Sequence, residues 1–207
     1  VQEGRLHVLG QNLCGLSPRE LVAVRRDIGF IFQFHNLFES LSALENVKMA
    51  LELHPYSDRQ RRDLAVGMLN ELGLGDRIHY KPANLSGSQK PRVAIARALV
   101  NKPRLILADE PTAALDKEAG RTVVDLIKKH AKNDKGTIIL VTHDIDEAVY
   151  LGQRVVVLSG SPTVVLEDLE IDLPPDRDQL NTRADARFVE LRGHVYARIQ
   201  QAKRATT

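Results

Sequence analysis

Apolar and polar positions alternate in blocks that predict strands separated by helices. Three apolar runs have the length of strands and are too short for buried helices: Ile28–Phe32, Leu105–Ala108 and Thr137–Val141. Strands that read as continuous apolar runs are typical of parallel sheets covered on both faces. The segments between them place apolar residues every three or four positions, which indicates amphipathic helices. The pattern therefore favours an α/β fold with a mainly parallel sheet.

Helix starts are marked by serine caps. Capping boxes, in which a glutamate or glutamine follows a serine by three positions, occur at Ser17, Ser42 and Ser86, and Asp58 opens a further helix. The helical pattern from Leu41 to about Tyr80, with the small-residue helix after Ser86, predicts a helical subdomain over 41–100. Asp116 is expected to cap another helix.

The two ends of the chain carry weaker signals. Residues 5–9 alternate like a strand, and 154–158 with 163–166 resemble a hairpin. After Pro174 and Pro175, a final helix is expected within a C-terminal extension over 176–207. Its apolar stripe consists of Phe188, Leu191, Val195 and Ile199.

Composition restricts the class of protein. The chain has 207 residues, a net charge of +2 with scattered Lys and Arg, 4% aromatic residues and no Trp, so nucleic acid is not an expected partner. Cys14 is the only cysteine, which excludes a disulfide framework and a cysteine-based zinc site. No apolar run approaches the ~20 residues of a membrane span, and no signal peptide is evident. We expect a soluble protein of a reducing compartment.

The main candidate for chemistry is the adjacent pair Asp109 and Glu110, followed by Pro111, at the end of the central apolar run. Ligands of parallel α/β sheets sit outside the carboxyl ends of the strands, where this pair would emerge. One acid would hold Mg²⁺, and the other would polarise a water molecule. Alternatively, the three residues merely close the strand in a solvated turn.

Three further features have both a structural and a functional interpretation. The segment Ser86–Gln89 is a capped helix start, and Gly87 would also let an anion approach its unpaired N–H groups. Gln33 and His143 each follow a strand. Taken alone, a loop-capping glutamine and a satisfied structural histidine are the more common interpretations.

Together, LSGSQ, LILADEP, ALD and THD occur in the order and spacing of one family. The chain resembles the nucleotide-binding subunit of an ABC transporter. The resemblance implies a P-loop NTPase fold of the ABC type, with ATP and Mg²⁺ as substrate and cofactor. It further implies a homodimer that sandwiches two ATP molecules, and transmembrane subunits as partners at the cytoplasmic face of the plasma membrane.

The resemblance also implies roles for individual residues. Asp109 resembles the Walker B metal ligand, Glu110 the general base, and Gln33 the glutamine that touches Mg²⁺ and the attacking water. His143 resembles the switch histidine that contacts the γ-phosphate. The signature loop, which caps the nucleotide of the opposite subunit, corresponds to Ser86, Gly87, Ser88 and Gln89. Asp116, with Ala114 and Leu115, resembles the loop at the dimer seam.

The two parts of the chain resemble different branches of the family. From Val1 to about Thr137, with HNLFESLSALENV, the chain resembles export-type subunits of the heterocyst-glycolipid, macrolide and lipoprotein-release kind. From about Thr142, THDIDEAVYLGQRVVVLS and DLPPDRDQLNTRADARF resemble nitrate, taurine and alkanesulfonate importers. Substrate and direction stay open, and a chimera is one interpretation.

Three departures from the family bear on activity. The 207 residues contain no G-x-x-x-x-G-K-[ST] motif, which the family places before the position of Val1. We therefore expect 1–207 to be an incomplete nucleotide-binding domain, without the strand that would lie beside Leu105–Ala108. Ser88 replaces a glycine of the signature loop. Pro91 stands in the first turns of the following helix, where the family usually has glutamine; proline is tolerable near a helix start and less so beyond the first turn.

The expected function is ATP hydrolysis that drives transport. The alternative is a truncated or degenerate subunit that only binds membrane partners, and a phosphate loop encoded upstream would distinguish truncation from degeneracy. A soluble ABC ATPase of DNA repair or chromosome maintenance would bring long heptads or a cysteine-rich zinc insert, and neither is present.

Overall fold

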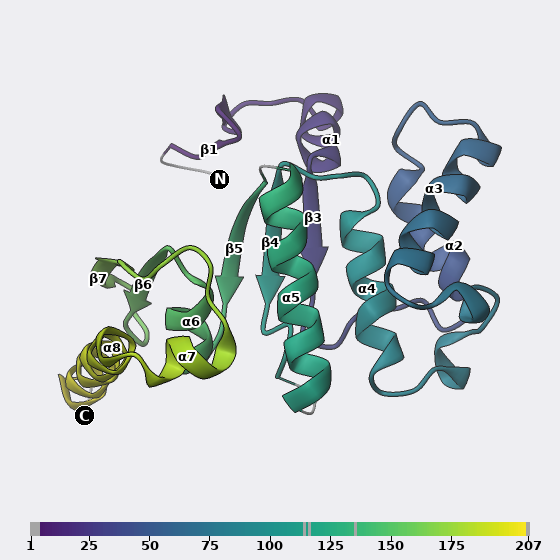
Figure 1. The fold of residues 1–207 in the computed structure, drawn as a ribbon. Coiled ribbons are helices and arrows are strands. Elements are labelled where there is room, and N and C mark those ends of the chain that lie inside the picture. Colours follow the sequence, from purple (N-terminus) through teal and green to yellow (C-terminus); the bar gives the residue numbers. More distant parts are fainter. Residues whose placement is uncertain (1–4, 114, 116, 135, 206–207) are drawn as a thin grey trace. The chain divides into compact units, whose positions relative to one another are not determined.

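The computed structural model describes residues 5–113, 115, 117–134 and 136–205. The chain divides into two compact units, Val1–Val141 and Thr142–Thr207 (Figure 1). Each unit is described by itself below. The subdomain boundaries expected from the sequence, 41–100 and 176–207, stay predictions.

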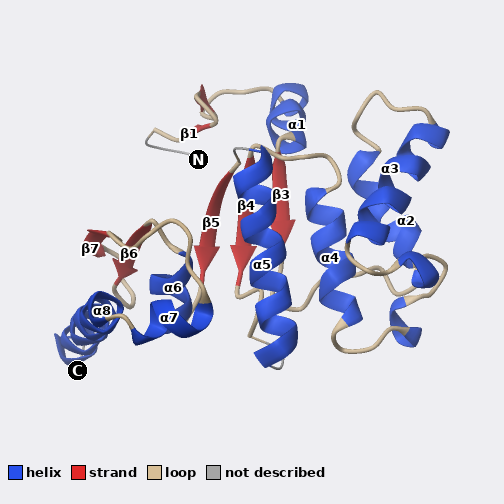
Figure 2. Cartoon of the chain, viewed as in Figure 1, coloured by secondary structure: helices blue, strands red, loops and turns tan. Residues whose placement is uncertain are grey.

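The first unit is built on a parallel sheet of three strands, β3 (Ile28–Ile31), β4 (Leu105–Asp109) and β5 (Thr137–Val141), in the order β3-β4-β5. Figure 2 shows the three strands side by side, and the register pairs Ile31 with Ala108 and Ala108 with Leu140. The three apolar runs are therefore strands, as predicted. However, β4 has a neighbour on both sides, so the expectation of an open sheet position beside Leu105–Ala108 is wrong. Among the described strands of this sheet, the unpaired edges belong to β3 and β5.

The two faces of this sheet differ in their cover. On one face, Ile106 and Ala108 are buried in a core that includes residues of α4 (Gln89–Leu99) and α5 (Lys117–Asp134). On the other face, Phe30 of β3 and Ile139 of β5 share a register row and are 42% and 52% exposed. The close packing on the covered side is visible at Gly29, where a Cβ atom would lie 2.4 Å from the carbonyl oxygen of Ala98.

Short helices occupy the sequence before and after β3. The first is α1 (Pro18–Arg26), and the later segment forms α2 (Ala43–Lys48), the 3₁₀ turn η1 (Met49–Leu51), α3 (Asp58–Glu71) and the turns η2 (Gly75–Arg77) and η3 (Pro82–Asn84). The predicted capping boxes of Ser17 and Ser42 are present, and Ser57 forms another. Helices α2, α3 and α4 pack on one another through fully buried Val47, Ala65, Leu69 and Val93.

The N-terminal strand expected over 5–9 is a smaller hairpin. It consists of β1 (His7–Val8) and β2 (Gln11–Asn12), which pair antiparallel. Leu9 and Gly10 between them both have positive φ angles, which end the alternation that suggested a longer strand.

The second unit is a hairpin packed with helices. It contains α6 (Ile145–Leu151), β6 (Arg154–Leu158), β7 (Val165–Glu170), α7 (Gln179–Ala184) and α8 (Ala186–Ala205). The predicted hairpin is confirmed, although its second strand begins at Val165 and runs to Glu170. Phe188, Leu191 and Val195 of α8 are buried, as the apolar stripe predicted.

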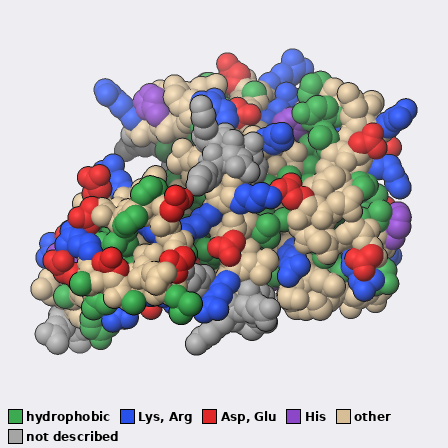
Figure 3. Space-filling model, in the orientation of Figure 1, with side chains coloured by type: hydrophobic (Ala, Val, Ile, Leu, Met, Phe, Trp, Pro, Cys, Tyr) green, Lys and Arg blue, Asp and Glu red, His purple; other side chains and the backbone are tan. Residues whose placement is uncertain are grey.

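Surface charge is mixed in sign. Figure 3 shows acidic and basic side chains interspersed on the visible face, in line with the small net charge. Among the described residues, none of the helices combines the length and the apolar character needed to cross a membrane.

Candidate functional site

The acidic pair lies at the carboxyl edge of the parallel sheet. Asp109 is the last residue of β4 and is exposed, and its register partner is Val141. Glu110 follows with φ +46°, and its N–H donates to the Val141 carbonyl oxygen at 2.9 Å. The left-handed region costs a residue with a side chain about 1–3 kcal/mol and is enriched at functional sites. The chain thus leaves the strand conformation between the two carboxylates.

Gln33 lies at the same edge. It is half-buried in the turn that follows β3, and β3 is the direct neighbour of β4. Because Ile31 is paired with Ala108, Gln33 and Asp109 leave adjacent strands at the same end of the sheet. The structure therefore brings Gln33, Asp109 and Glu110 to one edge, as their position after buried strands suggested.

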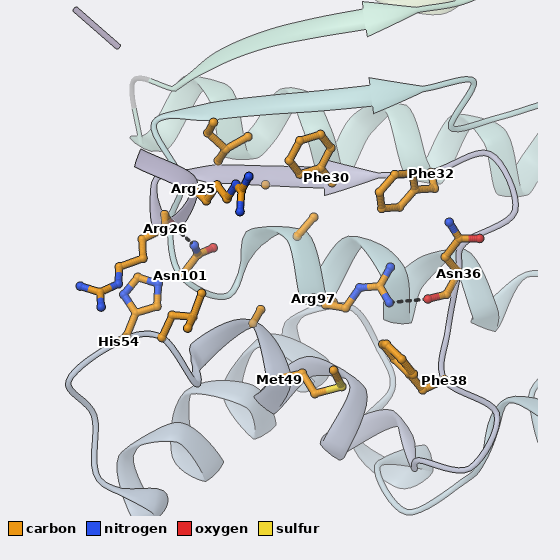
Figure 4. Close-up of a pocket in the computed structure, with 15 residues that line it drawn as sticks. Arg25, Arg26, Phe30, Phe32, Asn36, Phe38, Met49, His54, Arg97 and Asn101 are labelled. Atoms are coloured by element: carbon orange, nitrogen blue, oxygen red, sulfur yellow. Dashed lines mark hydrogen bonds between the residues drawn. The ribbon is translucent and has the colours of Figure 1, made fainter. Parts of the chain in front are cut away.

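The loop after Gln33 is held by an arginine that the sequence analysis missed. Arg97 of α4 donates from its guanidinium group to the carbonyl oxygen of Asn36 at 2.6 Å (Figure 4) and to that of His35 at 2.8 Å. Both acceptor residues have positive φ angles, 45° and 62°. A lone arginine within the apolar segment Val93–Val100 was the available signal, since an arginine is rarely buried without partners.

Partial burial also changes the pKa of His35 in this loop. Partial burial, with additional repulsion from Lys90 and Arg97, lowers the pKa of His35. The imidazole ring of His35 is therefore biased toward its neutral form beside the Arg97 guanidinium.

The signature loop forms the N-terminus of α4. Ser88 is the N-cap residue but makes no side-chain capping hydrogen bond. The Ser86 N–H donates to Gln89 Oε1 at 3.0 Å, whereas the Ser86 hydroxyl lies 3.2 Å from the Ser88 hydroxyl. Only half of the predicted capping box is thus present: α4 begins at Gln89 after Ser88, and the Gln89 N–H donates to the Ser86 carbonyl oxygen at 3.0 Å. Gly87 is exposed, and a Cβ atom there would meet nothing within 4 Å.

Pro91 causes no defect in this helix. It is the third residue of α4 and is buried. The N–H groups of a first turn have no partner within the helix, so a proline there removes no intrahelical hydrogen bond. Pro91 therefore lies in the part of the helix where proline is tolerable.

His143 belongs to the second unit, two residues after β5 ends. Next to it, Asp144 caps α6: its carboxylate accepts from the Glu147 N–H at 3.1 Å, and its own N–H donates to Thr142 Oγ1 at 3.0 Å. At the other end of α6, the Arg177 guanidinium group donates to the carbonyl oxygens of Tyr150 and Gly152. The predicted seam residues Ala114 and Asp116 lie outside the described residues.

The sheet, its helices and the acidic edge define an α/β P-loop NTPase fold of the ABC type. Residues 1–113 match the family described as ABC transporter. The chain belongs to the ABC transporter family. The matched range contains Gln33, the signature loop and the acidic pair.

Relatives in this family include exporter components. The chain is 41% identical over 162 residues to the lipoprotein-releasing system ATP-binding protein LolD of Pseudoalteromonas translucida, which covers 78% of this chain and 70% of that protein. It is 49% identical over 143 residues to the macrolide export ATP-binding/permease protein MacB of Hyphomonas neptunium, which covers 68% of this chain. The chain spans about a fifth of that protein's length (22%). The predicted relationship to export-type subunits of the macrolide and lipoprotein-release kind is confirmed.

A solved structure supports the fold. The ATP-binding cassette MJ0796, in a dimeric post-hydrolysis state bound to ADP and Pi, matches with a TM-score of 0.66 and 42% identity. The match covers 74% of this chain and 68% of that chain. The similarity of the C-terminal part to importers stays a prediction.

The donor set at the sheet edge fits a weakly ligated Mg²⁺ ion. Among the described residues, no group of three or more His, Cys, Asp or Glu side chains could hold a metal ion. Mg²⁺ in phosphoryl-transfer sites commonly takes only one or two carboxylates, with water and phosphate oxygens completing its shell. The exposed carboxylate of Asp109 suits that type of site and not a closed protein cage.

Proposed function

We propose that this chain is the ATP-binding and ATP-hydrolysing subunit of an ABC transporter that drives a substrate across a membrane. The observation that carries the proposal is the Asp109–Glu110 pair. It stands at the end of the central strand beside Gln33, with Glu110 in a left-handed conformation.

The three residues at the sheet edge would have different roles in ATP hydrolysis. Asp109 would hold Mg²⁺, which supplies positive charge against the phosphate oxygens when bound. Glu110 would accept the proton of the attacking water, because it is the acid next to the metal ligand and leaves the strand in a different backbone conformation. Gln33 would orient that water. Because Gln33 directly precedes the loop that Arg97 binds, a change in its position would be transmitted to that loop.

The remaining site residues would act from other elements. Ser86, Gly87, Ser88 and Gln89 would meet the γ-phosphate held by a second copy of the chain, through the N–H groups at the start of α4. His143 would contact the same γ-phosphate, and Asp116 would line the seam of the dimer. This assignment makes the homodimer part of the catalytic unit.

We further propose that the chain works as a peripheral subunit on the cytoplasmic face of the plasma membrane, bound to transmembrane subunits. Its family membership and its similarity to LolD support this role. The importer-like features after Thr142 leave the substrate and the direction of transport undecided.

One observation favours a second function, a subunit that binds partners without hydrolysis. Ser88 replaces the glycine of the signature loop, and its hydroxyl pairs with that of Ser86. This contact would compete with phosphate for the Ser86 hydroxyl in the dimer.

Glu110→Gln tests the proposed function in a version of the chain that carries a phosphate loop ahead of Val1. The amide keeps the shape of the side chain and removes the base. We expect retained MgATP binding, a longer-lived dimer and hydrolysis slower by ~10²-fold or more. Glu52→Gln, at an exposed glutamate outside the site, is the matched control. Hydrolysis near the wild-type rate in Glu110→Gln would refute Glu110 as the base, and no hydrolysis in the unsubstituted protein would favour the partner-only function.

A further inference from the structure

The C-terminal helix α8 is attached to the rest of the second unit by apolar and ionic contacts. It packs against α6 and buries an apolar stripe that consists of Phe188, Leu191 and Val195 (Figure 1). Three of its arginines form ion pairs with acidic residues of other segments: Arg187 with Asp172, Arg192 with Asp146, and Arg198 with Glu167. Of these pairs, that of Arg192 joins α8 to α6, since Asp146 is the second residue of α6.

The same start of α6 carries His143. The Asp144 N–H donates to Thr142 Oγ1, and the Asp144 carboxylate accepts from the Glu147 N–H. His143 lies between the two residues of the first contact, so the direction of its side chain depends on the position of the first turn of α6. Any contact that fixes Asp146 therefore acts on His143 through three residues of backbone.

His143 and α8 line one open cavity of about 520 Å³ in the second unit. One wall is the chain from His143 to Asp146, and the other is formed by Arg192, Gly193 and Tyr196 of α8. A Cβ atom at Gly193 would meet nothing within 4 Å, so this part of α8 does not press on the opposite wall. The cavity leaves space in which the segment with His143 could shift, and the Arg192–Asp146 pair bridges that space.

The bridging contact acts through charge. Arg192 Nη1 lies 3.7 Å from Asp146 Oδ1, which is too far for a hydrogen bond. By contrast, Arg198 Nε donates to Glu167 Oε2 at 2.7 Å. An ion pair between partly exposed side chains adds little to the stability of a fold. The effect expected of Arg192 is therefore local, on the start of α6.

We propose that Arg192 is a positioning residue for His143, which it holds in place through Asp146 and the first turn of α6. The inference rests on the proposed function, in which His143 contacts the γ-phosphate. A misplacement of about 1 Å in a catalytic group can cost ~10²-fold in rate. The contacts of Asp144 persist without Arg192, so the loss should be smaller than that. Docking of α8 then becomes a condition for full activity.

The first measurement is the rate of ATP hydrolysis by the version of the chain that carries a phosphate loop ahead of Val1. Arg192→Ala should lower kcat roughly three- to ten-fold and leave KM for MgATP within about two-fold, because the phosphate loop holds the nucleotide in the ground state. Arg192→Lys should restore most of kcat, since a charge at 3.7 Å from Asp146 does not require the geometry of a guanidinium group.

Arg198→Ala is the matched control for a merely structural role. It removes a shorter ion pair of the same helix and should lower the melting temperature at least as much as Arg192→Ala, by up to about 4 °C. Its partner Glu167 lies in β7 and does not line the cavity of His143. The kcat of Arg198→Ala should therefore equal that of the wild type.

A double-mutant cycle tests whether Arg192 acts through His143. His143→Ala should lower kcat by more than Arg192→Ala does, and the double variant should be no slower than His143→Ala alone. Asp146→Asn keeps the shape of the side chain and removes its charge. It should reproduce the loss of Arg192→Ala, and the two substitutions should not add.

The histidine ring signals in nuclear magnetic resonance give a readout without nucleotide. The chain has seven histidines, and the signal of His143 is the one that His143→Ala removes. Arg192→Ala should shift this signal, and Arg192→Lys should return it. Arg198→Ala should instead shift the signal of His194, whose Nε2 lies 2.8 Å from Glu167 Oε1, and leave that of His143 in place.

Two kinds of failure are distinguishable. An Arg192→Ala variant with wild-type kcat or an unshifted His143 signal, or an equal loss of kcat in Arg198→Ala, would overturn the proposal. A further loss in the His143→Ala background would also overturn it, because Arg192 would then act independently of His143. A wild-type kcat in His143→Ala would instead refute the role that the proposed function gives to His143, whatever the Arg192 variants do.

Discussion

Asn46 offers a quantitative test of how the loop after Gln33 is fixed. This residue of α2 is fully buried, and its side chain faces the backbone of residues 38–42. Its Oδ1 accepts from the Phe38 N–H at 2.8 Å. Its Nδ2 donates to the carbonyl oxygens of Phe38 at 3.2 Å, Leu41 at 3.2 Å and Ser42 at 2.9 Å. The Asn46 side chain therefore links the backbone of residues 38–42 to helix α2.

The cost of Asn46→Ala follows from these contacts. The amide group has two hydrogens, so its three donated contacts amount to two full hydrogen bonds, and the accepted bond makes three. A net contribution of about 1 kcal/mol per bond gives roughly 3 kcal/mol. Phe38 is 49% exposed, so water reaches part of the released backbone, and the Ser42 carbonyl oxygen keeps its bond from the Asn46 N–H. We therefore expect a loss of about 2–4 kcal/mol in the free energy of unfolding.

Urea denaturation followed by circular dichroism would measure this loss. Asn70→Ala removes the same atoms at an exposed position of α3 and should change stability by no more than ~0.5 kcal/mol. Hydrogen exchange at the Phe38 amide should accelerate in Asn46→Ala. A variant within ~0.5 kcal/mol of the wild type, with an unchanged exchange rate at Phe38, would refute the argument.

Three further predictions follow from the site and its loop. In the version with a phosphate loop, Ser88→Gly should raise ATPase activity with little change in melting temperature. Ser88→Ala removes only the hydroxyl, so comparing the two variants distinguishes the effect of the hydroxyl from that of the added side-chain bulk. An ATPase rate equal to or below the wild-type rate in both variants would show that serine is tolerated. The folded state lowers the pKa of His35, so its neutral ring should contribute fully to stability above the ordinary pKa near 6.5, and this contribution should be lost as the pH falls through the pKa of the folded state. Thermal unfolding at pH 7.5 and 5.5 should therefore show a smaller loss of stability between the two pH values in His35→Gln than in the wild type. The 207-residue chain alone should be poorly soluble, hydrolyse no ATP and bind MgATP no better than about millimolar (−4 kcal/mol) by isothermal titration, and a micromolar constant would show that the nucleotide site is misplaced.

Local chemistry explains what the sequence predicted well. The apolar runs Ile28–Phe32 and Leu105–Ala108 identify strands because they are too short for buried helices, although one face of the sheet, with Phe30 and Ile139, is exposed. The serines at 17 and 42 identify helix starts because both partners of a capping box lie within four residues. The acidic pair was likewise found from its position at the end of an apolar run.

Long-range contacts explain what the sequence could not show. Arg97 reaches carbonyl oxygens 61 and 62 positions away, and nothing near it in the sequence specifies that fold-back. The order of the strands is also non-local, which is why β5 occupies the position beside β4 that had been assigned to another strand. At Ser86, the local rule failed because α4 begins at Gln89 with Ser88 as its N-cap, two residues later than a cap at Ser86 predicts.

The exposed face of the three-stranded sheet carries apolar side chains from one edge strand to the other. Phe30 of β3 and Phe32, which follows that strand, stack with ring centroids 5.7 Å apart. Ile139 and Val141 of β5 continue the face at the opposite edge and are 52% and 54% exposed. Neighbouring strands lie about 4.8 Å apart, so β4 separates β5 from β3 by roughly 10 Å in all. An apolar face of this extent is typical of a contact surface.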